Sequence, residues 1–90
     1  MATYKITLVC TAVPITVTHK AASCIQEEFA QRPHHQNVLC TLSEKSLILT
    51  VENDFDSTGL ALSDEFSDAI TACISEIFDG TIEIRSVIAI

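Results

Sequence analysis

Alternation of apolar and polar residues is the feature that most limits how this 90-residue chain can fold. Tyr4, Ile6, Leu8 and Cys10 occupy every second position of residues 3–11. Side chains of a β-strand point alternately to opposite faces of the sheet, so this spacing predicts a strand that is buried on one side.

Three further segments show the same period and predict strands over residues 37–42, 46–52 and 81–90. The polar residues 43–45 join the first two of these strands as a hairpin. Residues 12–18 also alternate but contain Pro14, so they form either an edge strand or an extended arm. The side chains expected on the core side of the three strands are Val38, Cys40, Leu42, Leu47, Leu49, Val51, Ile82, Ile84, Ile88 and Ile90.

Two segments carry apolar stripes at helical spacing. The first predicts a helix over residues 19–32, with Thr18 as N-cap and Pro33 forcing the end. The second predicts a helix over residues 63–79 that Ser63 caps and Gly80 terminates. The expected buried stripes are Ala21, Ala22, Cys24, Ile25 and Phe29 in the first helix, and Phe66, Ala69, Ile70, Cys73, Ile74 and Ile77 in the second.

The element order is therefore strand, helix, strand, strand, helix, strand. This is the βαββαβ order of ferredoxin-like α+β sandwiches, in which two helices cover one face of a four-stranded antiparallel sheet. With only two glycines and two prolines, the chain has little material for long loops. We expect residues 1–90 to form a single domain.

The net charge of −7 limits the classes of partner. Nucleic acids and anionic membranes need a basic surface, so the charge argues against both. RNA-recognition domains of this topology also need aromatic residues on their central strands, and residues 5–9 and 47–51 contain none. No apolar run approaches the roughly 20 residues that cross a bilayer. The charge favours a basic protein partner or a cation.

The four cysteines are Cys10, Cys24, Cys40 and Cys73, and none forms a CxxC pair. Each lies in an apolar pattern, where a free thiol packs as a small hydrophobic group. No signal peptide precedes the first predicted strand. We therefore expect four free thiols in a reducing, cytoplasmic environment.

The sheet face away from the helices offers a candidate binding surface. The alternation places Val9, Leu39, Ile48 and Val87 on that face, among charged and threonine side chains. Apolar patches of this kind often mark interfaces, so we expect partner docking or homodimerisation through this face.

Acidic residues concentrate between positions 52 and 68. They can attract a basic partner over a long range. The main functional hypothesis is a small acidic binding protein without enzymatic activity, such as an inhibitor or immunity-type protein that occupies a basic surface. The acids expected to contact that partner are Glu52, Asp54, Asp56, Asp64, Glu65 and Asp68.

An alternative hypothesis is calcium binding. The spacing of Asp54, Asp56, Thr58 and Glu65 around Gly59 resembles an EF-hand loop, in which oxygen ligands occupy positions 1, 3, 5, 7 and 12. The carbonyl of Leu60 would be the ligand at position 7. Position 9 is apolar and no second loop is present, which are both departures from the EF-hand pattern.

The remaining candidates for chemistry are weaker. His34 and His35 follow Pro33 and are predicted to lie in an exposed turn, because their spacing to the cysteines matches no standard zinc site. No cysteine has the electropositive setting of a nucleophile. A small-molecule regulatory domain is a third alternative, although the first turn lacks the glycines that such domains often contain.

Overall fold

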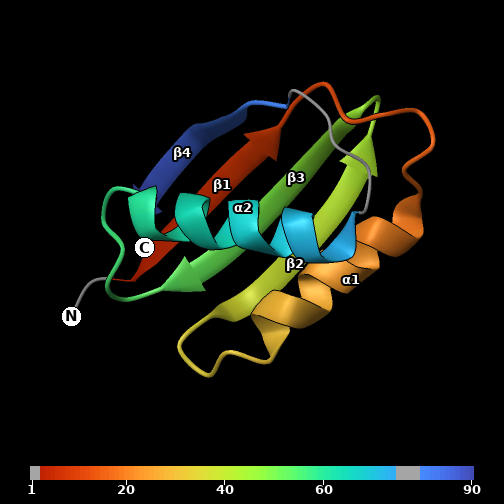
Figure 1. Ribbon diagram of the computed structural model, residues 1–90. Helices are drawn as coiled ribbons and strands as arrows, with labels where there is room; N and C mark the ends of the chain where they lie inside the picture. Colours follow the sequence, from red (N-terminus) through yellow and green to blue (C-terminus); the bar gives the residue numbers. More distant parts are fainter. Residues whose placement is uncertain (1–2, 75–79) are drawn as a thin grey trace.

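A computed structural model describes residues 3–74 and 80–90, which form a four-stranded antiparallel sheet with two helices on one face (Figure 1). The strand order is β2-β3-β1-β4. The arrangement confirms the ferredoxin-like βαββαβ order predicted from the sequence. The elements are β1 (Tyr4–Cys10), α1 (His19–Ala30), β2 (Gln36–Ser43), β3 (Ser46–Asn53), α2 (Leu60–Cys73) and β4 (Ile82–Ala89).

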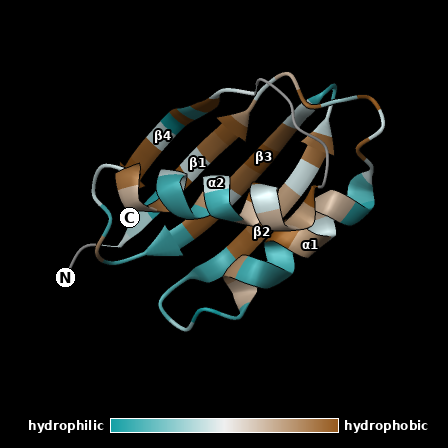
Figure 2. Cartoon of the chain, in the orientation of Figure 1, coloured by the Kyte–Doolittle hydropathy of each residue, from teal (hydrophilic) through white to brown (hydrophobic). Residues whose placement is uncertain are grey.

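The core lies between the sheet and the two helices. Ile6 and Leu8 of β1 are fully buried, and they stand opposite Val51 and Leu49 of β3. Phe66 of α2 belongs to the same buried cluster. Figure 2 shows the central strands as largely hydrophobic, whereas both helices also carry hydrophilic residues. The period-2 alternation in the strands and the stripes on the helices therefore meet in one apolar layer.

Residues 12–18 form an arm rather than an edge strand. Val13 is buried, and its backbone N–H donates a hydrogen bond to the carbonyl of Lys45 at 2.9 Å. The arm ends at Thr18, whose hydroxyl accepts a hydrogen bond from the N–H of Lys20. Thr18 is therefore the N-cap of α1, as predicted.

The start of α2 differs from the prediction. The helix begins at Leu60, and Ser63 lies in its first turn, where its N–H bonds to the carbonyl of Gly59 at 2.9 Å. Ser63 is therefore not the cap. Gly59 has φ +80°, and a Cβ there would stand 3.2 Å from Cγ2 of Ile84. Both the backbone angle and the close approach to β4 favour glycine at this position.

The end of α2 also differs from the prediction. The last helical residue is Cys73, and Ile74 follows it in an extended conformation. Gly80 therefore does not terminate the helix. The predicted continuation through residues 75–79, including Ile77, lies outside the described residues.

A β-bulge in β4 changes the face of the sheet on which the later side chains of this strand lie. Thr7 pairs with Ser86 but Leu8 pairs with Ile84, so Arg85 is an extra residue on β4. After the bulge Val87 pairs with the buried Ile6 and packs against the core.

Two predictions about β4 are consequently wrong. Val87 does not lie on the open face of the sheet. Ile88 does not share a face with Ile82 and Ile84, because it stands opposite Lys5 on the open side and is 53% exposed. A shift of one residue moves every later side chain to the other face.

A disulfide joins Cys24 of α1 to Cys73 of α2, with their Cα atoms 5.9 Å apart. Cys10 and Cys40 are free and buried. The prediction of four free thiols is therefore wrong. The pair is separated by 49 positions in the sequence and comes together only because both helices pack side by side on one face.

We expect the disulfide to stabilise the fold by closing a long loop in the unfolded chain. Reduction, or replacement of both cysteines by serine, should lower the free energy of unfolding by about 2–4 kcal/mol. Urea titration with and without reductant measures this change. The double variant should not respond to reductant, and a wild-type chain with the same urea midpoint in both conditions would contradict the prediction.

Candidate functional site

A polar cluster lies where the end of α1, the turn into β2, the end of β3 and α2 meet. Its centre is His35, whose side chain has no exposed surface. The rings of Phe29 and Phe55 lie 5.6 Å and 5.9 Å from the His35 ring and enclose it. We call this group the His35 cluster; its polar members are Arg32, His34, His35, Asn53 and Glu65.

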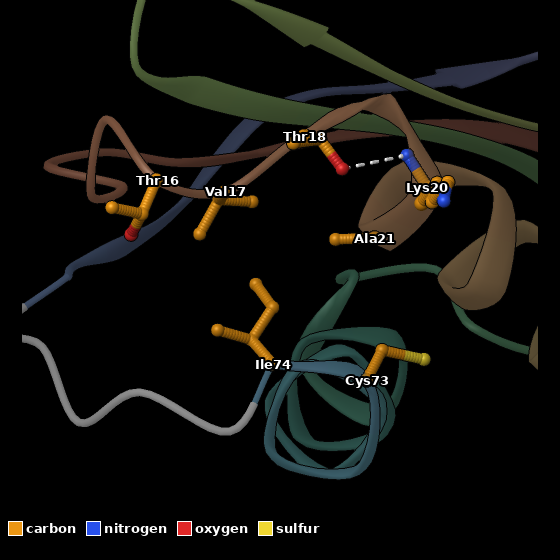
Figure 3. A pocket seen from close by; sticks show the side chains of 7 residues that line it. All are labelled: Thr16, Val17, Thr18, Lys20, Ala21, Cys73 and Ile74. Atoms are coloured by element: carbon orange, nitrogen blue, oxygen red, sulfur yellow. Dashed lines mark hydrogen bonds between the residues drawn. The ribbon is translucent and has the colours of Figure 1, made fainter.

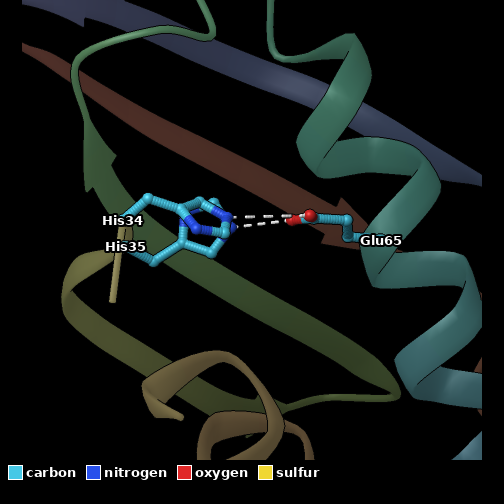
Figure 4. Close-up of side chains that lie close together, drawn as sticks. All are labelled: His34, His35 and Glu65. Carbon is cyan, nitrogen blue, oxygen red and sulfur yellow. Dashed lines mark hydrogen bonds and ion pairs between the residues drawn. The ribbon is translucent and has the colours of Figure 1, made fainter. Parts of the chain in front are cut away.

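Glu65 is the common partner of the cationic and imidazole side chains. Its Oε2 lies 2.7 Å from Nε2 of His35 and 3.3 Å from Nη1 of Arg32, and its Oε1 lies 4.0 Å from Nε2 of His34. Figure 4 shows both imidazole rings facing the Glu65 carboxylate from the turn that precedes β2. The contacts attach α2 to the segment between α1 and β2.

The proton on His35 can be assigned from the hydrogen bonds of Asn53. Oδ1 of Asn53 accepts from the backbone N–H groups of Phe55 at 3.3 Å and Asp56 at 3.0 Å. Its Nδ2 must therefore face Nδ1 of His35, at 3.4 Å. Because an amide nitrogen only donates, Nδ1 accepts, and Nε2 carries the hydrogen that is donated to Glu65.

His34 and His35 are both predicted from the sequence to lie in an exposed turn, and this is wrong for His35, which is buried. No periodic pattern exists in a turn, so nothing in the sequence shows that one of two adjacent histidines points inward. The partner, Glu65, lies 30 positions away.

Asp56 caps α2 with both carboxylate oxygens. Oδ1 accepts from the N–H of Gly59 and Oδ2 from the N–H of Leu62, each at 2.9 Å. The residue is only 5% exposed. A carboxylate at a helix N-terminus satisfies free N–H groups and interacts favourably with the helix dipole.

The five predicted calcium ligands are not gathered around one point. Asp54 is exposed, and the Thr58 hydroxyl accepts from the N–H of Leu60 at 3.4 Å. Glu65 points to the His35 cluster, and both oxygens of Asp56 are used by the helix cap. Residues 54–59 therefore lead into α2, and the Asp56 carboxylate is engaged by the start of that helix.

The six predicted contact acids are also divided. Asp64 and Asp68 are exposed on α2, and Asp54 is exposed on the loop before it. Glu52 lies on the opposite face of the sheet, where it accepts from Nδ2 of Asn37 at 3.0 Å. Asp56 and Glu65 are held by internal contacts and do not form part of an exposed acidic surface.

The open face keeps three of its four predicted apolar residues. Val9 stands opposite Ile48, and Leu39 lies opposite Thr50 on the next row. Leu39 is 53% exposed, whereas Val9 is only 6% exposed. Ile88 replaces Val87 on this face because of the bulge in β4.

Among residues 3–74 and 80–90, a surface cavity of about 240 Å³ lies between the start of α1 and the end of α2 (Figure 3). A second cavity, of about 270 Å³, adjoins the His35 cluster. Both are smaller than the roughly 300–1,000 Å³ of typical small-molecule sites. The second cavity is lined by Thr3, Pro33, His34, Gln36, Asn53 and Asp54.

The free thiols are poor nucleophiles. Burial raises the pKa of the Cys40 thiol to about 12 and also raises the pKa of Cys10. The thiolate is the reactive form, so neither group has the property that nucleophilic catalysis requires.

Comparison with known protein families, curated proteins and solved structures yields no significant match. Within residues 3–74 and 80–90, neither helix is long and apolar enough to cross a bilayer.

We expect Asp56→Ala to destabilise the fold strongly, because it leaves two N–H groups at the start of α2 without their acceptor. The free energy of unfolding should fall by about 2–3 kcal/mol, measured by urea titration. Asp54→Ala is the matched control at an exposed position and should change it by less than about 0.5 kcal/mol. Equal effects of the two substitutions would contradict the role of Asp56.

The thiols should react slowly in the folded chain. At pH 8, Ellman's reagent should label Cys10 and Cys40 far more slowly than a free cysteine, because burial raises both pKa values. Denaturation without reductant should expose two thiols per chain, and denaturation after reduction should expose four. Four thiols before reduction would mean that the disulfide is absent.

Proposed function

We propose that this chain is a non-enzymatic protein-binding module that uses the open face of its sheet to contact a basic partner. The observation that carries the proposal is an uncovered sheet face with exposed apolar side chains, while both helices pack on the other face. In this proposal the helices and the core serve to hold that face in shape.

The composition of the open face supports direct contact with a protein. Ile48 stands opposite Val9, next to the pair of Thr7 and Thr50. Val9 is almost completely buried, so the apolar surface open to a partner comes from Leu39, Ile88 and the half-buried Ile48. Leu39 extends the apolar surface towards the edge strand β2. Branched side chains on a sheet are conformationally stiff, so little side-chain entropy is lost when they are covered.

Charge favours a basic partner over a second copy of the chain. On the open face itself the charges are matched, because Glu83 forms an ion pair with Arg85 at 3.7 Å and Glu52 stands opposite Lys5, so the attraction comes from the net charge of the chain. The net charge is −7, so two copies would repel each other, whereas a basic protein would be attracted. An inhibitor or immunity-type protein that occupies a basic surface is one form of this function.

Localisation in the cytoplasm remains the expectation from the sequence. The disulfide weighs against it, because cytosolic proteins of most organisms keep their cysteines reduced. Alkylation of free thiols in acid-quenched host cells would show whether Cys24 and Cys73 are reduced, as expected in the cytoplasm, or joined by a disulfide, as expected in an oxidising compartment.

We expect Thr50→Arg, at the centre of the open face, to abolish capture of a basic partner from host lysate. Ser67→Arg on the exposed side of α2 is the control, since it changes the net charge equally at a distant surface. Quantitative mass spectrometry should find basic proteins that bind wild type and Ser67→Arg, elute with salt and are absent with Thr50→Arg. Identical capture by all three chains, or equal loss with both variants, would contradict the proposed surface.

A further inference from the structure

We propose that His34, His35 and Glu65 bind a transition-metal ion, with zinc as the best match. Their ligand atoms all lie within 4.8 Å of one another, and no other group of three His, Cys, Asp or Glu residues in the described part of the chain meets this condition. The site is distinct from the open face, so a test of metal binding is independent of the protein-binding proposal.

The donor set points to zinc or a neighbouring divalent metal. Two imidazole nitrogens and one carboxylate suit zinc, cobalt and nickel, whereas calcium and magnesium prefer oxygen ligands only. Zinc sites with two histidines and one glutamate leave a fourth position for water or another ligand. Here that position would open towards solvent, because the His34 side chain is 45% exposed while His35 is enclosed.

The distances bracket those of a tetrahedral site. Metal–ligand bonds of about 2.0–2.1 Å place neighbouring ligand atoms about 3.3 Å apart in a tetrahedron. The two measured separations from Glu65 are 2.7 Å to Nε2 of His35 and 4.0 Å to Nε2 of His34, one shorter and one longer than this value. A tetrahedral site therefore requires the Glu65 carboxylate, which is 30% exposed, to move away from the enclosed His35 and towards His34.

Two features of the cluster disfavour metal binding and should lower its affinity for zinc: the Arg32 guanidinium and the hydrogen on Nε2 of His35. The Arg32 guanidinium lies 3.3 Å from Oε2 of Glu65, and this cation must turn away when a metal binds. Its side chain is 33% exposed and so has a path to solvent. Nε2 of His35 carries a hydrogen, which must move to Nδ1 before Nε2 can coordinate.

The movement of this hydrogen involves Asn53. With hydrogen on Nδ1, His35 would face a second donor, the Nδ2 group of Asn53, at 3.4 Å. Metal-bound histidines usually donate their other N–H to an acceptor, and a carboxylate there strengthens binding. Asn53→Asp would supply that carboxylate and could still accept from the backbone N–H groups of Phe55 and Asp56.

The first experiment is a calorimetric titration of the oxidised chain with zinc chloride. Wild type should bind one ion per chain. His34→Ala should weaken binding by at least about tenfold. His19→Ala is the control, because His19 is exposed at the start of α1 and lies outside the cluster. Absence of zinc binding by the wild type, or equal binding by wild type and His34→Ala, would overturn the proposal.

The second experiment uses Asn53→Asp and keeps the proposal testable without removing a ligand. Zinc affinity should rise by about tenfold, since the new carboxylate accepts the Nδ1 hydrogen of His35. Circular dichroism confirms that the variant is folded before titration. Unchanged or weaker affinity in the folded variant would overturn coordination through Nε2 of His35.

Discussion

Strand β1 is the constraint on which the rest of the structure depends. It pairs with β3 along one edge and with β4 along the other, so its side chains decide which face of the sheet can be covered. Ile6, Leu8 and Cys10 point to the same face and are buried there. Both helices must pack on this face to remove these side chains from water. The other face, which carries Lys5 and Thr7, is left uncovered, and it is the surface on which the proposed binding function rests.

The buried carboxylate of Asp56 has a similar effect on the polar end of the molecule. Because it accepts the N–H groups of Gly59 and Leu62, it determines where α2 begins. The start of the helix in turn determines that Glu65 faces His35 rather than the loop. Two acids of a strongly acidic chain are therefore engaged in internal contacts and are not free to form hydrogen bonds with a protein partner. A count of charges along the sequence does not distinguish these roles.

The repeating patterns predict the helices and strands correctly, and the wrong predictions fall where a pattern is interrupted. All six elements were predicted, because apolar periods of two and of 3.6 residues report burial on one face. The start of α2 was missed because its capping side chain lies before the glycine, whereas Ser63 resembled an ordinary N-cap. The faces of β4 were misassigned after Arg85, since a bulge changes the parity of a strand without changing its composition. The inward position of His35 was missed because a turn has no period.

The sequence by itself determined the order of the elements, the residues of the core in β1 and β3, and the sign of the surface charge. These properties depend on residues close together in the chain, where the backbone geometry relates spacing to direction. Only the tertiary structure decided that Cys24 meets Cys73, that Glu65 meets His35 and that Ile88 rather than Val87 lies on the open face. The two cysteines are 49 positions apart and Glu65 is 30 positions from His35. Ile88 is placed on the open face by its pairing with Lys5, 83 positions away. Such pairs are defined by how helices and strands are placed relative to one another, and no local spacing encodes that placement.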